Sequence, residues 1–236
     1  GDRVVIGNRV GGFAEYINVD AASVRPIPDG VTFAKAAGYS TAYLTAYVAL
    51  AVRGQLQPGE TLLVHGAAGG VGMAAVDLGK QMGATVIATA GSDEKLARVQ
   101  ARGADHIINY SLDNGELGGF RETVKALTDG RGADVIYDPV GGSVFDESMR
   151  CINWGGRILT IGFTSGVWPN AAVNHILIKQ ISVIGVRAGE IGRRDPALGE
   201  RCRQAVYDLL KDGQIDPYVC AHFPLPESVD ALAMLR

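Results

Sequence analysis

A glycine-rich turn stands directly between an apolar run and a helical run. Residues 61–72 read T-L-L-V-H-G-A-A-G-G-V-G, and a helical pattern follows over 73–82. Ala67, Gly69 and Gly72 occupy the small-residue positions of a G-x-G-x-x-G fingerprint, with alanine in place of the first glycine. Small residues there permit a tight turn, let the backbone approach a pyrophosphate and allow close packing of helix on sheet. The free N–H groups of the helix start would face the anion, so the pattern predicts a dinucleotide-binding turn.

The end of the second strand of such a unit selects between NAD and NADP, because the adenosine ribose lies beside it. Here the strand runs into A-T-A-G-S, with no acidic residue until Asp93. Ser92 stands at a helix start, and Lys95 follows one helical turn later, where its ammonium group could reach a phosphate. These residues favour NADPH, although Lys95 also fits an ordinary solvated helix lysine. Tyr110 could stack on or hydrogen-bond the adenosine phosphate, or be an ordinary strand-end tyrosine.

Alternating strands and helices surround this turn. Apolar runs predict six strands, and continuous runs of this kind imply a parallel sheet covered by helices on both faces. The expected fold class is therefore α/β, with a Rossmann doubly wound six-stranded parallel sheet in the order 3-2-1-4-5-6. The expected strands span 61–65, 85–90, 105–108, 134–138, 157–162 and 181–186, and the helices after 73–82 span 93–102, 116–128, 144–151 and 171–179.

Both ends of the chain have a different pattern. Two short β segments are expected over 2–7 and 12–20 around a glycine-rich turn, then an extended connector over 25–30 and helices over 33–38 and 42–52. A charged loop is expected after Arg187, followed by a helix over 196–210, an extended piece over 218–223 and a helix start at 226–228. The sequence thus begins inside a β region and stops within a helix, as expected of part of a longer protein.

Composition limits the possible partners and compartments. With 22 basic and 25 acidic residues among 236, the net charge of −3 suggests neither nucleic acid nor a membrane surface as a partner. No apolar run reaches the roughly 18 residues of a membrane span. Three widely spaced cysteines argue against a disulfide framework, and a cytoplasmic location is expected. The 32 glycines, about twice the usual share of roughly 7%, suit many strand-to-helix turns.

Five stretches together resemble a known family. They are L-T-A-Y at 44–47, H-G-A-A-G-G-V-G-M at 65–73, A-T-A-G-S-D-E-K at 88–95, G-A-D-H-I-I-N-Y at 103–110 and Y-D-P-V-G-G at 137–142. In this order they resemble the zinc-independent quinone oxidoreductases, including ζ-crystallin, of the medium-chain dehydrogenase/reductase superfamily. The resemblance implies remnants of a GroES-like β-rich catalytic domain at 1–38, an NADPH-binding Rossmann domain at 39–190 and an incomplete C-terminal return to the catalytic domain at 191–236.

The resemblance also implies a set of cofactor contacts. Thr45 would lie near the nicotinamide ring and orient it, although it also fits a helix threonine bonded to a backbone carbonyl. The resemblance implies that the pyrophosphate contacts Gly70 and Val71, and that the adenosine side contacts Gly91, Ser92, Lys95 and Tyr110. The middle of the cofactor would lie along Pro139 and Val140. The nicotinamide end would contact Gly162, Phe163, Thr164, Ser165, Val186, Arg187 and Ala188.

Zinc is not expected. Related alcohol dehydrogenases resemble C-x-x-x-T-G-Y where this chain has T-A-Y-L-T-A-Y, so Thr41 stands at the metal-ligating cysteine. Threonine is a poor zinc ligand compared with thiolate or imidazole. His65 and the Cys220-x-His222 pair are interpreted as structural residues.

The chemistry expected without a metal is hydride transfer from NADPH to a quinone or an activated alkene, because such acceptors spread the incoming charge onto their own oxygen. An enoyl-thioester reductase and a non-catalytic, crystallin-like NADPH-binding protein are the alternatives. A hydrolase lacks support, since no G-x-S-x-G motif is present.

The apolar edge strand I-S-V-I-G-V, from Ile181 to Val186, together with the family's edge-to-edge dimers, predicts a homodimer.

Overall fold

The computed structural model describes residues 1–7, 11–111 and 117–234 and divides by its internal contacts into two units. The first unit comprises Gly1–Ser40 and Tyr207–Arg236, and the second comprises Thr41–Val206. The domain boundaries expected after residues 38 and 190 stay a prediction. None of the helices in the described part of the chain has the length and apolar character needed to cross a lipid bilayer.

A parallel sheet forms the centre of the second unit. Among the described residues it has six strands in the order β5-β4-β3-β6-β7-β8, and every neighbouring pair is parallel. This confirms the predicted α/β class and the doubly wound order, because β3 and β6 meet where the order reverses. The strands are β3 (Thr61–Val64), β4 (Thr85–Ala90), β5 (His106–Asn109), β6 (Ala133–Asp138), β7 (Ile152–Thr160) and β8 (Ser182–Gly185).

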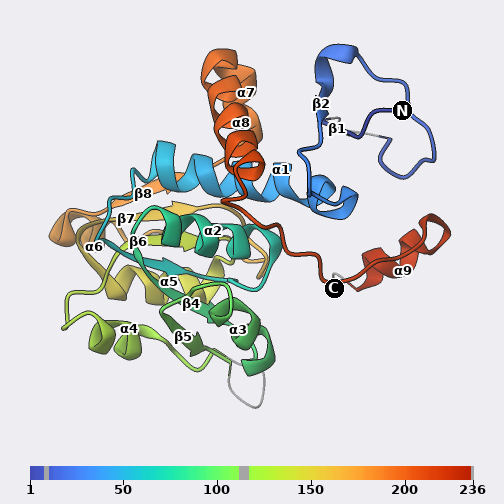
Figure 1. Cartoon of the computed structure of the whole chain (residues 1–236). Coiled ribbons are helices and arrows are strands. Elements are labelled where there is room, and N and C mark those ends of the chain that lie inside the picture. Colours follow the sequence, from blue (N-terminus) through green and yellow to red (C-terminus); the bar gives the residue numbers. More distant parts are fainter. Residues whose placement is uncertain (8–10, 112–116, 235–236) are drawn as a thin grey trace. The chain divides into compact units, whose positions relative to one another are not determined.

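The strands are buried because apolar side chains cover both faces of the sheet. Leu63 and Ile136 point to one face, where Phe145 and Met149 of α5 complete a cluster that also contains Phe120. On the opposite face, a Cβ built on Gly79 of α2 would stand 2.5 Å from Leu62 Cδ2, so α2 lies very close to β3. Figure 1 shows α2 on one side of the sheet and α5 on the other. Each fully buried Leu, Ile or Phe contributes roughly 1.5–3 kcal/mol through the hydrophobic effect.

Helices connect the strands as the alternating pattern predicted. Helix α1 continues directly into a π-helical segment, η2, where two separate helices were expected over 33–38 and 42–52. Residue 116, where the predicted helix 116–128 begins, lies outside the described residues. The helices are α1 (Phe33–Tyr47), η2 (Val48–Arg53), α2 (Gly70–Gln81), α3 (Asp93–Gln100), α4 (Arg121–Leu127), α5 (Gly142–Cys151), α6 (Val173–Lys179), α7 (Ala188–Arg194) and α8 (Pro196–Lys211).

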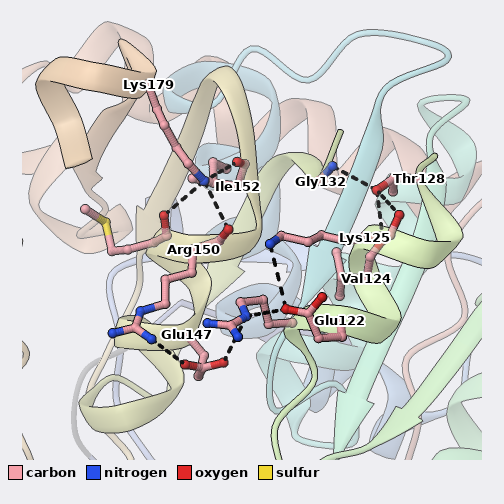
Figure 2. Close-up of polar contacts among 11 residues, drawn as sticks. Glu122, Val124, Lys125, Thr128, Gly132, Glu147, Arg150, Ile152 and Lys179 are labelled. Atoms are coloured by element: carbon pink, nitrogen blue, oxygen red, sulfur yellow. Dashed lines mark hydrogen bonds and ion pairs between the residues drawn. The ribbon is translucent and has the colours of Figure 1, made fainter. Parts of the chain in front are cut away.

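Side chains satisfy the carbonyl groups at the ends of two helices (Figure 2). Lys179 Nζ donates to the carbonyl oxygens of Met149, Arg150 and Ile152 at 3.3, 3.1 and 3.0 Å, so one ammonium group caps the end of α5. Thr128 Oγ1 donates to Val124 O at 2.8 Å and accepts from Gly132 N at 2.8 Å. Such contacts occupy carbonyls that a helix leaves without an internal partner.

Helix α7 occupies the stretch after Arg187 that was expected to be a charged loop. The reason lies in its charge spacing. Glu190 forms ion pairs with Arg193 at 3.1 Å and with Arg194 at 3.1 Å, at i,i+3 and i,i+4. Side chains at these spacings meet on a helix surface and favour the helical state.

The first unit contains an antiparallel pair of short strands, β1 (Val4–Ile6) and β2 (Val24–Pro26). The turn η1 (Ala21–Ser23) precedes β2, and η3 (Leu225–Glu227) leads into α9 (Ser228–Ala233). Tyr207 Oη donates to Pro26 O at 3.0 Å within this unit. Of the predicted turn between the first two β segments, residues 8–10 lie outside the described residues.

The β segment predicted over 12–20 is wrong: these residues form no strand, and β2 comes later, in the predicted connector. Phe13 and Tyr16 are exposed, so alternation there does not mark a buried face. Asp20 Oδ1 accepts from Ala22 N at 2.9 Å, which starts the turn η1 instead.

Candidate functional site

The predicted cofactor residues follow the carboxyl ends of the parallel strands. The turn at 65–72 follows β3, Gly91 follows β4, Tyr110 follows β5, Pro139 follows β6, and the segments 162–165 and 186–188 follow β7 and β8. Because the strands are parallel, all these segments lie along one edge of the sheet. Ligands of doubly wound folds bind along this edge, at the point where strand order reverses.

Glycines in the turn after β3 let helix α2 begin very close to the turn. Gly66 has φ of +54°, and Gly69 N donates to Gly66 O at 3.0 Å. A Cβ on Gly72 would stand 2.3 Å from Gly66 O and 2.8 Å from Ala67 Cα, so only glycine allows α2 to begin against the turn. Ala67 N donates to Thr89 O at 3.0 Å, which holds the turn onto the end of β4.

The start of α2 leaves backbone donors open. Within the described part of the chain, no protein acceptor is found for the amides of Gly70 and Val71, the first residues of the helix. A Cβ built on Gly70 would meet nothing within 4 Å, and Gly69 and Gly70 are exposed. Two free N–H groups, open space in front of them and the positive end of a helix dipole form an arrangement suited to a phosphate group.

The adenosine side is formed by the ends of β4 and β5. Ser92 Oγ accepts from Lys95 N at 3.4 Å and caps α3, as its predicted place at a helix start requires. Asp93 Oδ1 accepts from Asn109 Nδ2 at 2.8 Å, so the nearest carboxylate is engaged by the neighbouring strand. Lys95 is exposed and has no ion pair among the described residues.

Tyr110 is half buried beside these residues. Its ring lies 6.5 Å from that of Phe120, between centroids, and packs against the core cluster. Burial raises the pKa of the Tyr110 hydroxyl above its ordinary value, with a smaller contribution from the charge of Asp138. The packing suits an ordinary strand-end tyrosine, and the predicted contact with the cofactor stays a prediction.

The turn after β6 packs on the turn after β3. A Cβ on Gly66 would stand 3.3 Å from Pro139 Cγ and 3.4 Å from Val140 Cγ2, so the two turns touch at the switch point. Asp138 Oδ1 fixes the second turn by accepting from Val140 N at 2.8 Å and Gly141 N at 3.0 Å. Asp138 Oδ2 is buried and has no partner among the described residues. Burial raises the pKa of Asp138, and the two amides act in the opposite direction.

The predicted nicotinamide end is formed by the ends of β7 and β8. Val186 N donates to Thr160 O at 2.9 Å, which joins the two strand ends. Thr164 N donates to Pro139 O at 3.0 Å and Ser165 N to Val140 O at 3.1 Å, so the loop after β7 is tied to the turn after β6. The loops after β6, β7 and β8 therefore lie side by side, as the predicted order of their strands implies.

Thr45 makes the contact expected of an ordinary helix threonine: its Oγ1 donates to Thr41 O at 2.8 Å. Its neighbour Leu44 lines a small surface hollow together with Ala188, Ile191 and Cys202. Residues 44 and 188 therefore meet at one hollow, which brings α1 next to the end of β8. The proximity of Thr45 to a nicotinamide ring stays a prediction.

His65, at the base of the phosphate turn, belongs to a buried polar chain. Its Nδ1 lies 2.8 Å from Thr89 Oγ1 and its Nε2 lies 2.8 Å from Ser148 Oγ. Ser148 Oγ donates to Val144 O at 2.7 Å, so it accepts from Nε2–H and the proton of the ring is on Nε2. Complete burial lowers the pKa of His65 to about 3, which keeps the ring neutral. This side chain acts as a structural residue beneath the turn.

No metal cluster is found in residues 1–7, 11–111 and 117–234: no three or more His, Cys, Asp or Glu side chains gather there as ligands. Thr41 is exposed, and its carbonyl accepts from Thr45. Cys220 and His222 are both exposed.

Two features were missed from the sequence. Asp138 lies in the stretch Y-D-P-V-G-G, and the signal for its role was a carboxylate at a strand end directly before a turn. Trp168 and Val167 lie in the loop after β7 and are exposed. The signal for these two residues was a tryptophan in an uncharged loop that follows a strand end.

The sequence profile described as "Zinc-binding dehydrogenase" matches residues 70–205. The chain belongs to this zinc-binding dehydrogenase family. Residues 70–205 run from the phosphate turn through β8 into α8, so the match includes most of the predicted cofactor edge.

Curated proteins with similar sequences carry quinone oxidoreductase names. A "Quinone oxidoreductase-like protein 2 homolog" from Nematostella vectensis is 37% identical over 237 residues, covering 100% of this chain and 64% of the relative. The mouse "Quinone oxidoreductase-like protein 2" is also 37% identical, over 98% of this chain and 65% of its own length. The chain thus spans about two thirds of the length of these curated relatives.

Solved structures have the same fold. The quinone oxidoreductase from Thermus thermophilus, whose structure is described with its NADPH complex, matches with a TM-score of 0.84 and 31% identity, covering 100% of this chain and 73% of that chain. The CurK enoyl reductase matches with a TM-score of 0.79 and 27% identity, over 92% of this chain and 63% of that chain. Both of these solved structures, which share this fold, are thus named as oxidoreductases.

Proposed function

We propose that the carboxyl edge of this sheet binds NADPH. The observation that carries the proposal is the pair of open amides at Gly70 and Val71, which face unfilled space where the strand order reverses. In this arrangement the first turn of α2 receives the pyrophosphate, and Pro139 and Val140 lie along the middle of the cofactor. The NADPH complex of the Thermus thermophilus relative supports the same cofactor.

The preference for NADPH over NADH comes from the adenosine side. The strand β4 ends without an acidic residue, and Oδ1 of Asp93, the first acid after it, already accepts a hydrogen bond from Asn109. Lys95 offers an exposed ammonium group without an ion pair among the described residues. A 2′-phosphate at this point would therefore meet the positive charge of Lys95, with no acidic residue at the end of the strand itself.

We infer that the complete protein reduces a quinone or an activated alkene without zinc. Bound NADPH supplies the hydride. The chain's own contribution is to bind and orient: backbone at 162–165 and 186–188 holds the nicotinamide end, and Thr45 stands on α1 beside the hollow lined by Leu44 and Ala188. Thr41, a poor metal ligand, supports zinc independence. Conjugated acceptors suit this chemistry because they need no Lewis acid to carry the developing charge.

A reductase of enoyl thioesters is the second candidate, favoured by the match to the CurK enoyl reductase. A non-catalytic NADPH-binding protein is the third. Oxidation of NADPH by the complete protein, followed by absorbance with a small quinone and with crotonyl-CoA, separates them. Faster turnover of the quinone supports the proposal, faster turnover of crotonyl-CoA favours the second candidate, and binding of NADPH without turnover favours the third.

We also propose a homodimer joined through β8. This strand pairs with β7 on one side only within the described residues, and Val183 is exposed. Apolar side chains of the neighbouring helix α6, Val173, Leu177 and Ile178, are exposed as well. A free strand edge with such surroundings invites pairing. A dimeric mass in solution at micromolar concentration is expected, and a monomeric mass would contradict the proposal.

The proposed domains follow the sequence division: a partial GroES-like catalytic domain at 1–38, the Rossmann domain at 39–190 and the return to the catalytic domain at 191–236. The parallel sheet and its phosphate turn within residues 61–185 support the middle one.

A further inference from the structure

The loop after β7 presents an exposed aromatic surface. Trp168 is 81% exposed, Val167 57% and Phe163 41%. The two rings lie 6.4 Å apart, between centroids, with their planes tilted by 54°, so neither ring covers the face of the other. Large exposed aromatic side chains gathered in one loop are characteristic of a binding surface, because leaving them in water is unfavourable.

This surface is held in a fixed place. The loop is tied to the turn after β6 by three backbone hydrogen bonds, in which Thr164 and Ser165 donate to Pro139 and Val140, and Gly142 N donates to Val167 O at 3.2 Å. A Cβ on Gly141 would stand 3.0 Å from a Phe163 ring carbon, so the loop lies directly against this glycine. Ser165 Oγ accepts from Val167 N at 3.3 Å and steadies the loop from within.

The loop lies next to the predicted nicotinamide end. It begins directly after the end of β7, where Thr160 accepts from Val186 at the end of β8. The turn that supports it also packs on Gly66 of the phosphate turn. An aromatic surface at this place is therefore held in a fixed position relative to the predicted cofactor edge.

The chemistry of the loop selects between acceptors. Residues 158–174, I-L-T-I-G-F-T-S-G-V-W-P-N-A-A-V-N, contain no charged residue. A coenzyme A thioester carries phosphates that require a basic path, whereas a neutral aromatic quinone requires a flat apolar surface. An exposed indole face and a tilted phenyl ring provide such a surface.

We propose that Trp168, with Phe163 and Val167, forms the acceptor-binding wall of the site and that this wall selects a neutral, fused-ring aromatic quinone. The inference rests on the proposed function and names the acceptor class of the same site. Trp168 is a specificity-determining residue, since it contacts the ring of the acceptor and does not take part in hydride transfer.

Steady-state kinetics of the complete protein test this role. With 2-methyl-1,4-naphthoquinone as the acceptor, Trp168→Ala is expected to raise KM about tenfold and Trp168→Phe about twofold, because phenylalanine retains an aromatic face. The KM for NADPH stays unchanged, as does the KM for the small non-aromatic enone methyl vinyl ketone. Trp154→Ala is the matched control: Trp154 is 66% exposed but lies near the amino end of β7, at the opposite edge of the sheet.

A binding measurement gives a second readout that needs no turnover. Trp154 and Trp168 are the two tryptophans of this sequence, so the change in quenching that Trp168→Phe causes reports on Trp168, and the change that Trp154→Phe causes reports on Trp154. In the presence of NADP⁺, 2-methyl-1,4-naphthoquinone is expected to quench Trp168 saturably and Trp154 only in proportion to its concentration.

The outcomes separate this inference from the proposed function. Binding of NADPH together with an unchanged quinone KM in Trp168→Ala would overturn the inference and leave the cofactor proposal standing. Equal, non-saturating quenching of both tryptophans would also overturn it. Failure to bind NADPH, measured by titration of the same preparation, would refute the proposed function, and saturable quenching of Trp168 would still support the aromatic wall.

Discussion

Gly70 and Gly72 lie two residues apart in the phosphate turn and have different surroundings. A methyl group on Gly72 would collide with Gly66 O at 2.3 Å, whereas a methyl group on Gly70 would meet no protein atom within 4 Å. Gly72→Ala is therefore expected to lower the free energy of unfolding by about 2 kcal/mol or more, because the backbone of α2 must move. Chemical denaturation measures this difference.

Gly70→Ala is the matched control and a test of the site. Its stability should stay within about 1 kcal/mol of the wild type, since alanine suits a helix and the space is open. Its affinity for NADPH should fall about tenfold, because the added methyl group enters the space proposed for the pyrophosphate. Unchanged affinity in Gly70→Ala would place the nucleotide elsewhere.

His65 predicts a specific dependence of stability on pH. Its pKa is about 3 in the folded protein and about 6.5 when unfolded. Between these values the unfolded state binds more protons, so stability falls as pH decreases, by about 1.4 kcal/mol per pH unit. From pH 7 to pH 5 this residue should account for a loss of about 2 kcal/mol. Denaturant midpoints at pH 7, 6 and 5 measure the loss.

The variant His65→Asn isolates the contribution of His65 to the pH dependence of stability, because asparagine does not titrate. Asp138 acts in the opposite direction: burial raises its pKa, so its contribution to stability falls as pH increases above its ordinary value near 4. The Asp138 effect is present in both proteins, so the difference in slope reports on His65 alone. Equal slopes for wild type and His65→Asn would contradict the neutral, buried ring.

At the scale of elements, a lysine of α6 caps the end of α5, and this cap makes a measurable contribution to the free energy of unfolding. Lys179 donates three hydrogen bonds to carbonyls at the carboxyl end of α5 (Figure 2). Lys179→Met keeps the side-chain length and removes the donors, so unfolding free energy should fall by about 1–3 kcal/mol. Lys125→Met is the control, since Lys125 Nζ lies 3.8 Å from an exposed Glu122 carboxylate and its loss should cost less than about 0.5 kcal/mol. Equal effects would contradict the cap.

The strands of the sheet could be predicted because their sequences are continuous apolar runs, which only a doubly covered parallel sheet buries. Leu62, Leu63 and Val64 illustrate this, with no exposed surface on either face. The strand order followed from the fingerprint after β3, because that turn normally belongs to the first strand of a doubly wound fold.

Other elements could not be predicted for identifiable reasons. The alternating residues at 12–20 resemble a strand, but Phe13 and Tyr16 are exposed and no neighbouring strand pairs with them among the described residues. The stretch 188–194 has a loop-like composition, and its helix depends on ion pairs of Glu190 that become possible only once the turn has formed.

At the scale of the whole molecule, the strand ends could be predicted as the site, and the contacts between their loops could not. Gly66, Pro139 and Phe163 are distant in sequence. The predicted strand order makes their loops neighbours, but the individual contacts depend on how the turns pack on one another. The second carboxylate oxygen of Asp138 is buried without a partner among the described residues, and no sequence pattern reports the burial of a single atom.

Ligand binding at this edge should stabilise the fold as a unit. NADPH at about 100 times its dissociation constant should raise the unfolding free energy by about 2.7 kcal/mol if it binds only the folded protein. Thermal unfolding followed by circular dichroism measures the shift. NADH at the same concentration should give a smaller shift.

The most direct test of the NADPH site is a calorimetric titration of NADPH and NADH into three proteins: wild type, Lys95→Ala and Arg98→Ala. Arg98 lies one turn beyond Lys95 on α3 and is paired with Glu94, so its removal is a control for the loss of one positive charge. NADPH should bind the wild type and Arg98→Ala about tenfold more tightly than NADH, and this preference should largely disappear in Lys95→Ala. Equal affinities for the two nucleotides in all three proteins would contradict the account.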